Sequence, residues 1–99
     1  MFVGTVEFDL LLGDVHSLKE KRSIVRPIVA ELRKRFDVAV AEVDGLDLHR
    51  RAMIGVAAVA VDAAHCRDVL DECDRFIGGR PEVEVLSARR RLFGPHDED

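Results

Sequence analysis

The stretch that decides the fold is "FVGTVEFDLLLGDVHSLKE", residues 2–20, because its hydrophobic pattern changes halfway along. Over residues 2–12 mostly apolar and mostly polar positions alternate, and a period of two predicts a β-strand. Ser17 and Glu20 have the spacing of a capping box, in which each side chain satisfies a backbone N–H at a helix start. The sequence therefore predicts a strand that is followed directly by a helix over about residues 17–35.

The rest of the chain continues this alternation of strands and helices. The predicted elements are a short strand over 37–43, a turn over 44–47, a long strand from about 48 to 61, a helix over 63–78 capped by Asp62, and a strand over 82–93. The order βαββαβ predicts an α+β fold of the ferredoxin-like type, with a four-stranded antiparallel sheet and two helices on one face. Residues 1–93 are expected to form a single domain, and residues 94–99 an acidic C-terminal tail.

Two features of these elements lead to further expectations. Pro27 projects from the polar side of the first helix, so a bend rather than a break is expected there. The run "AMIGVAAVAV", residues 52–61, is apolar on both faces of the third strand, so both faces are expected to be covered. A two-layer domain covers only one, and a homodimer is therefore predicted. Met53, Val59 and Val61 lie on one face of this strand, and Ile54, Val56 and Ala58 lie on the other face.

Composition sets limits on the class of protein. The 99 residues, 47% of them hydrophobic and 34% charged, suffice for one core. The longest uncharged run is about half of what a membrane-spanning helix needs, and the chain starts without a signal-like basic segment, so a cytoplasmic protein without membrane contact is expected. Cys66 and Cys73 are seven residues apart on a predicted helix, beyond disulfide reach, and are expected to be buried thiols.

The charges are unevenly distributed along the chain. The net charge is −4, from 15 basic and 19 acidic residues, and Asp97, Glu98 and Asp99 supply three of the negative charges. On the first helix, a basic stripe lies beside the apolar face, whereas Lys21 projects over the edge of the core and must find a partner or extend to water. The candidate RNA- or anion-binding residues are Lys19, Lys21, Arg22, Arg26 and Arg33.

The strand arginines have a different interpretation. Arg89 and Arg91 share one face of the last strand and are placed to pair with Glu7 and Asp9 of the first strand, so structural or solvated roles are favoured. The chain has no Trp, Tyr, Asn or Gln, which removes the usual means of stacking bases and of reading adenine. Recognition of structured RNA through its backbone or shape remains compatible with the sequence.

An enzyme would need a constellation of reactive groups, and none is evident. Acylphosphatases share the fold, but their asparagine is absent and "GDVHSLKEKR" does not match their phosphate loop. His16, His65 and His96 stand alone. An acidic loop could bind a cation, although such residues are also common in turns; it comprises Glu42, Asp44, Asp47 and His49. No catalytic residue, metal site or cofactor is predicted.

Two strings carry a resemblance to a known family. They are "SLKEKRSIVRPIVAELRKRF" and "VAVAEVDGLDLHRRAMIGVA", and they resemble the YlxP-like family of uncharacterised bacterial proteins over about residues 2–93. The most specific matches are Ser17, Leu18, Lys19, Lys21, Arg22, Ala41, Glu42, Val43, Asp47, Arg51, Ala52, Ile54 and Gly55. The resemblance implies a ferredoxin-like fold, frequent dimerisation and genes that often lie among translation-factor and ribosome-maturation genes. It implies no activity.

Three hypotheses follow from the sequence. The leading one is a non-enzymatic module that binds structured RNA or a ribosomal particle through the basic face of the first helix. The alternative is a homodimeric module that binds a small ligand or has a regulatory role. A phosphate-handling enzyme that uses the same cations is the third.

Overall fold

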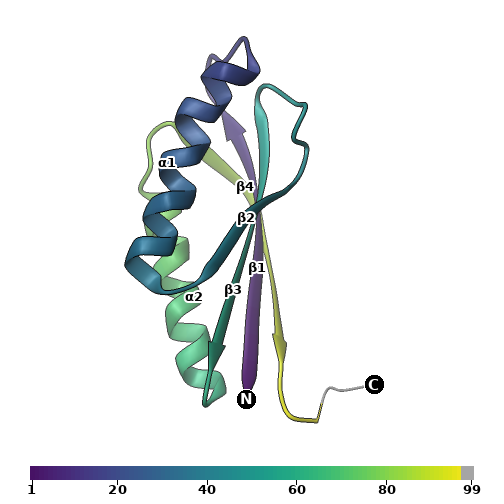
Figure 1. Ribbon diagram of the computed structural model, residues 1–99, viewed down its shortest axis with the longest axis vertical. Coiled ribbons are helices and arrows are strands. Elements are labelled where there is room, and N and C mark those ends of the chain that lie inside the picture. The colour runs from purple at the N-terminus through teal and green to yellow at the C-terminus, as the bar shows by residue number, and fades with distance from the viewer. Residues whose placement is uncertain (97–99) are drawn as a thin grey trace.

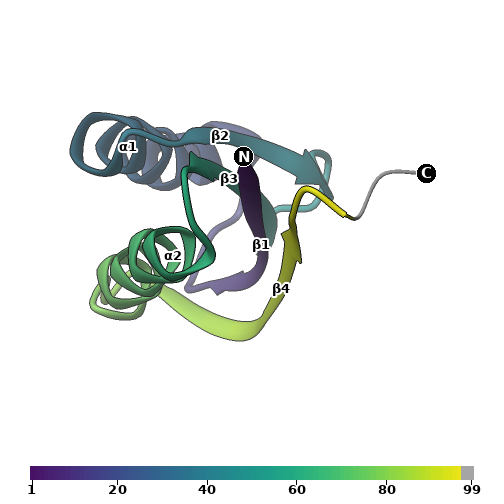
Figure 2. The same cartoon turned by 90° about the horizontal axis from the view of Figure 1, so that it is seen from below.

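Strand β1 (Phe2–Leu12) occupies an interior position in a four-stranded antiparallel sheet, which confirms the ferredoxin-like α+β fold (Figure 1). A computed structural model describes residues 1–96 of the chain. The remaining elements are α1 (Leu18–Phe36), β2 (Ala39–Asp44), β3 (Arg51–Ala60), α2 (Ala63–Gly78) and β4 (Val83–Phe93). The sheet order is β2-β3-β1-β4, and Figure 2 shows that both helices lie on the same side of the sheet. The predicted acidic tail begins within the described residues, but residues 97–99 lie outside them.

The hydrophobic core lies between the sheet and the two helices. Alternate side chains of β1 and β3 face the helices, so the period of two seen in the sequence is the period of burial. The main buried residues are Val6, Phe8, Leu10 and Leu12 of β1, Ile54 and Val56 of β3, Val25, Ile28 and Leu32 of α1, and Leu70, Cys73 and Ile77 of α2. Burying each large side chain contributes roughly 1.5–3 kcal/mol, and this term fixes which face of the sheet the helices cover.

The third strand differs from the prediction in length. It begins at Arg51 rather than near Leu48, because the residues between β2 and β3 form a tight loop. Gly45 adopts a left-handed conformation (φ 66°), and the Leu48 N–H donates to the Gly45 carbonyl at 3.0 Å. Apolar Leu46 and Leu48 therefore lie exposed in a loop, whereas their hydrophobicity favoured a strand.

Residues 1–96 cover only one face of β3, so they do not meet the expectation that both faces are covered. Ile54 and Val56 are buried under the helices, but Gly55 and Ala57 on the opposite face are only half-buried, and Val59 is 66% exposed. Alanine and glycine remove little apolar area from water, so a face built from them needs no cover for stability. We call this uncovered side of the sheet the open face.

The helices and cysteines agree with the sequence. Helix α1 continues through Pro27, whose side chain is exposed, so the proline does not end the helix. Cys66 and Cys73 are both buried free thiols in α2. Burial, together with the negative charges of Asp74 and Glu72, raises the pKa of Cys73 to about 11.

Candidate anion-binding face

The start of α1 is built by the predicted cap. Ser17 has an extended backbone, and its hydroxyl accepts a hydrogen bond from the Glu20 N–H at 3.1 Å. The Ser17 hydroxyl also lies 3.5 Å from Glu20 Oε1, so the two side chains of the capping box are in contact. This local arrangement satisfies a backbone donor that has no partner within the helix, and it fixes where the helix begins.

Lys21 is the one candidate residue that the fold buries. Its side chain is 2% exposed, and Nζ lies 2.7 Å from Glu42 Oε2 of β2. Nζ also donates to the carbonyl oxygens of Gly45, at 2.8 Å, and Leu46, at 3.4 Å. The expectation that Lys21 must find a partner is therefore confirmed, and its ammonium group is not part of the exposed basic surface.

Arg33 is exposed but also engaged with the protein. Its guanidinium donates to the backbone carbonyl of Val40 in β2. Lys21 and Arg33 thus connect the two ends of α1 to the same edge strand, at positions two residues apart along that strand. Both cations have structural partners that the helical stripe alone does not reveal.

The other three candidate cations remain exposed to solvent. Lys19, Arg22 and Arg26 make no ion pair or side-chain hydrogen bond within the described part of the chain. Together with Ser23 and Pro27 they line a shallow surface hollow of about 410 Å³ on α1. We call Lys19, Arg22 and Arg26 the helix-1 basic face. Its chemistry suits a negatively charged group such as a phosphate, since all three groups are free to donate.

The position of this face runs against the electrostatics of the helix. Lys19 and Arg22 lie in the first turn and a half of α1, where the helix macrodipole disfavours a positive charge by about 0.3–1 kcal/mol. Glu20 is the only acidic residue of the first turn, and its side chain lies near Ser17 rather than pairing with a cation. The helix start therefore has an excess of positive charge.

The strand arginines are distributed between both faces of the sheet. Arg89 lies 3.9 Å from Glu7, as the sequence suggested, whereas Asp9 pairs with Arg51 of β3 instead of Arg91. Two hydrogen bonds join Arg51 to Asp9, and they raise the pKa of the Arg51 guanidinium above its ordinary value. Arg90 faces the helices and pairs with Asp71 and Asp74 of α2. These contacts tie strands to each other and to α2.

Some features of the site could not be found in the sequence. The sequence groups Glu42 with the acidic loop, but its carboxylate pairs with Lys21. The sequence showed that Lys21 needs a partner, because it projects over the edge of the core, but it did not show that the partner is Glu42. His49, Asp44 and Asp47 do not assemble into a metal site, since residues 1–96 contain no cluster of three or more potential ligands.

In that same range neither helix combines the length and hydropathy needed to cross a membrane.

Comparison with known proteins gives a family but no activity. The family model described as "Protein of unknown function (DUF503)" matches residues 3–90. The chain is also similar to the "Uncharacterized protein YlxP" of Bacillus subtilis (strain 168), with 30% identity over 91 residues, which covers 92% of this chain and 99% of that protein. The matched region contains every strand and helix except Phe2 at the start of β1 and the last three residues of β4. The chain therefore belongs to the YlxP-like DUF503 family of proteins of unknown function.

Proposed function

We propose that this protein is a non-enzymatic cytoplasmic module that binds structured RNA, alone or in a ribosomal particle, through the helix-1 basic face. The observation that carries the proposal is that Lys19, Arg22 and Arg26 share one hollow at a helix start and have no acidic partner among residues 1–96. Lys21 and Arg33, which are engaged with β2, are assigned to the fold rather than to RNA.

The chemistry of the face favours the phosphate backbone over the bases. Three flexible cations neutralise phosphates without reading sequence, and the chain has no Trp, Tyr, Asn or Gln to add stacking or adenine recognition. The helix-1 basic face also contains no aromatic side chain. A folded RNA, in which phosphates from different segments come close together, suits such a compact set of cations better than a flexible single strand.

The test is binding to ribosomal RNA over a series of salt concentrations. A variant with Lys19, Arg22 and Arg26 replaced by Gln is expected to lose most of its affinity at low salt. The matched control replaces Arg67, Arg75 and Arg89 by Gln, which removes the same charge from exposed positions elsewhere. Absence of binding by the native protein at low salt, or an equal loss in both variants, would refute the assignment to α1.

A second candidate function rests on the open face. We propose, as the alternative, a homodimeric module that binds a small ligand or has a regulatory role, because the uncovered side of β3 ends in Val59, which is 66% exposed, and Phe93 of β4 is 37% exposed. A pair of open faces would cover these side chains. Light scattering is expected to show a dimer at micromolar concentration and a monomer for Val59→Glu; a monomeric native protein would contradict this part of the proposal.

A further inference from the structure

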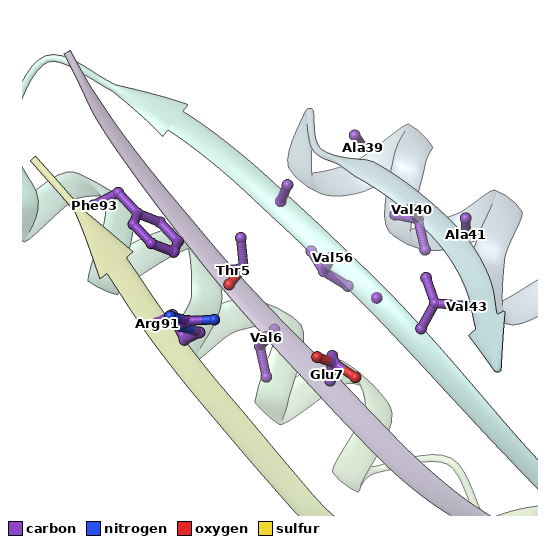
Figure 3. A pocket seen from close by; sticks show the side chains of 12 residues that line it. Thr5, Val6, Glu7, Ala39, Val40, Ala41, Val43, Val56, Arg91 and Phe93 are labelled. Atoms are coloured by element: carbon purple, nitrogen blue, oxygen red, sulfur yellow. The ribbon is translucent and has the colours of Figure 1, made fainter. Parts of the chain in front are cut away.

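A shallow groove of about 480 Å³ runs along the open face (Figure 3). Its apolar floor consists of small side chains on the two strands at one side of the sheet, namely Ala39 and Ala41 of β2 with Gly55 and Ala57 of β3. In Figure 3 the side chains of Arg91 and Phe93 reach from β4 toward β1, where Thr5 and Glu7 form a polar ridge. Val43 lies on the opposite side of the floor.

The strand register places two opposite charges next to each other beside this floor. Arg91 pairs with Thr5 across β4 and β1, and Thr5 pairs with Ala57 across β1 and β3. Glu7 is two residues further along β1, in the row that contains Gly55. Arg91 and Glu7 are therefore diagonal neighbours, at a separation of about 7–8 Å between backbones.

Neither charge is strongly committed to a partner in the protein. Arg91 makes no ion pair within the described residues, and its guanidinium lies 5.2 Å from the ring centre of Phe93. Glu7 has a distant contact, 3.9 Å, with Arg89, and both side chains are about half or more exposed, so the pair contributes little. The groove thus has an available cation, a weakly held carboxylate and an apolar floor.

We propose that this groove binds an aliphatic α-amino acid. The ligand carboxylate meets Arg91, its ammonium group meets Glu7, and its side chain covers Ala57 and Gly55. A simple anion leaves Glu7 without a contact and a simple cation leaves Arg91 without one, whereas a dipolar molecule contacts both groups. The inference deepens the second candidate function, because it names the class of ligand for the open face.

The experiment is an NMR titration of the isotope-labelled protein, residues 1–99, with L-leucine. Isocaproate has the same carbon skeleton without the ammonium group, and isoamylamine lacks the carboxylate. L-leucine is expected to shift the backbone amide signals of Gly55, Ala57 and Thr5 with a dissociation constant on the order of millimolar, while each analogue binds about three- to fivefold more weakly. Equal binding of all three compounds, or no shift of these signals with L-leucine, would overturn the proposal.

Variants test the position of the ligand. Ala57→Leu fills the floor and is expected to abolish the shifts, whereas Ala57→Ser keeps a small side chain and should retain them. Arg91→Gln should remove the preference for L-leucine over isoamylamine, and Glu7→Gln the preference over isocaproate. Arg67→Gln on α2 is the remote control. The proposed site is wrong if L-leucine still binds Ala57→Leu and if Arg91→Gln and Glu7→Gln each keep the preference that they are expected to lose.

Measuring the oligomeric state beside the L-leucine titration distinguishes failure of the ligand proposal from failure of the dimer proposal. All groups that line the groove come from one chain. If light scattering shows a monomer and L-leucine still shifts the groove signals, the dimer is wrong and the ligand proposal stands. If the protein is a dimer and L-leucine shifts none of them, the ligand proposal is wrong.

Discussion

Lys21 on α1 and Glu42 on β2 form an ion pair of 2.7 Å in which the lysine side chain is buried and the carboxylate is 21% exposed. The same ammonium group donates to two carbonyls of the loop between β2 and β3. One side chain therefore joins the start of a helix, an edge strand and a loop. Burying an ammonium is unfavourable unless charge and hydrogen bonds compensate, which makes this pair sensitive to the loss of either partner.

Glu42→Gln is expected to lower the free energy of unfolding by about 2–4 kcal/mol, because the ammonium of Lys21 stays buried without a counter-charge. Urea unfolding monitored by circular dichroism measures the change. Glu31→Gln, which breaks the exposed pair with Arg35, is the matched control and should change stability by about 0.5 kcal/mol or less. A Glu42→Gln variant as stable as the native protein would show that the pair is energetically neutral.

The salt dependence of RNA binding should distinguish exposed from buried cations of α1. Replacing Lys19, Arg22 and Arg26 by Gln should reduce the slope of log affinity against log salt by about 2–3, since each cation displaces roughly one counterion. Lys21→Met should leave the slope unchanged, because its ammonium is already occupied by Glu42. A Lys21→Met variant with a reduced slope would place that residue in the RNA contact.

Gly55→Ala should destabilise the protein by about 1–2 kcal/mol through overpacking. A Cβ atom at this position would lie 2.8 Å from Val43 Cγ1, so the valine must shift. The double variant Gly55→Ala with Val43→Ala should recover part of the loss. Gly13→Ala is the control, because a Cβ at Gly13 meets nothing within 4 Å. Thermal unfolding with equal losses for the two single alanine variants would argue against the contact with Val43.

Stability should fall at alkaline pH because of Cys73. Burial raises the pKa of this thiol to about 11, so the folded state retains a proton that the unfolded chain releases at lower pH. Stability from this group is fully present below about pH 8.5 and is lost as pH rises toward 11, by roughly 2–3 kcal/mol. Urea unfolding across this range should show a steeper decline for the native protein than for Cys73→Ala; parallel curves would contradict it.

Much of the fold follows from local sequence patterns. The capping box of Ser17 and Glu20, the cap at Asp62 and the hydrophobic periods predicted all six elements, because burial of one face leaves its period in the sequence. The start of β3 was misplaced, since Leu48 looks like a strand residue while a hydrogen bond to Gly45 and the ammonium of Lys21 hold the loop around it. Such a long-range contact leaves no local signal.

The candidate site was only partly predictable. Helical spacing placed Lys19, Arg22 and Arg26 together correctly, because position on a helix surface is set by residue number alone. The same spacing could not show that Arg33 reaches the carbonyl of Val40, since that depends on how α1 packs against β2. The groove was not foreseen, because it depends on the register between neighbouring strands and on which side chains of the sheet stay uncovered.

The bond from Arg33 to Val40 also bears on how the protein avoids uncontrolled assembly. Strand β2 is at the edge of the sheet, and an edge strand offers its unpaired backbone groups to strands of other molecules. Arg33 takes up one such carbonyl and brings a charged group to that edge. The opposite edge, β4, carries consecutive arginines and a register shift where it pairs with β1. Both edges thus carry features that disfavour edge-to-edge pairing of the sheet with strands of other molecules.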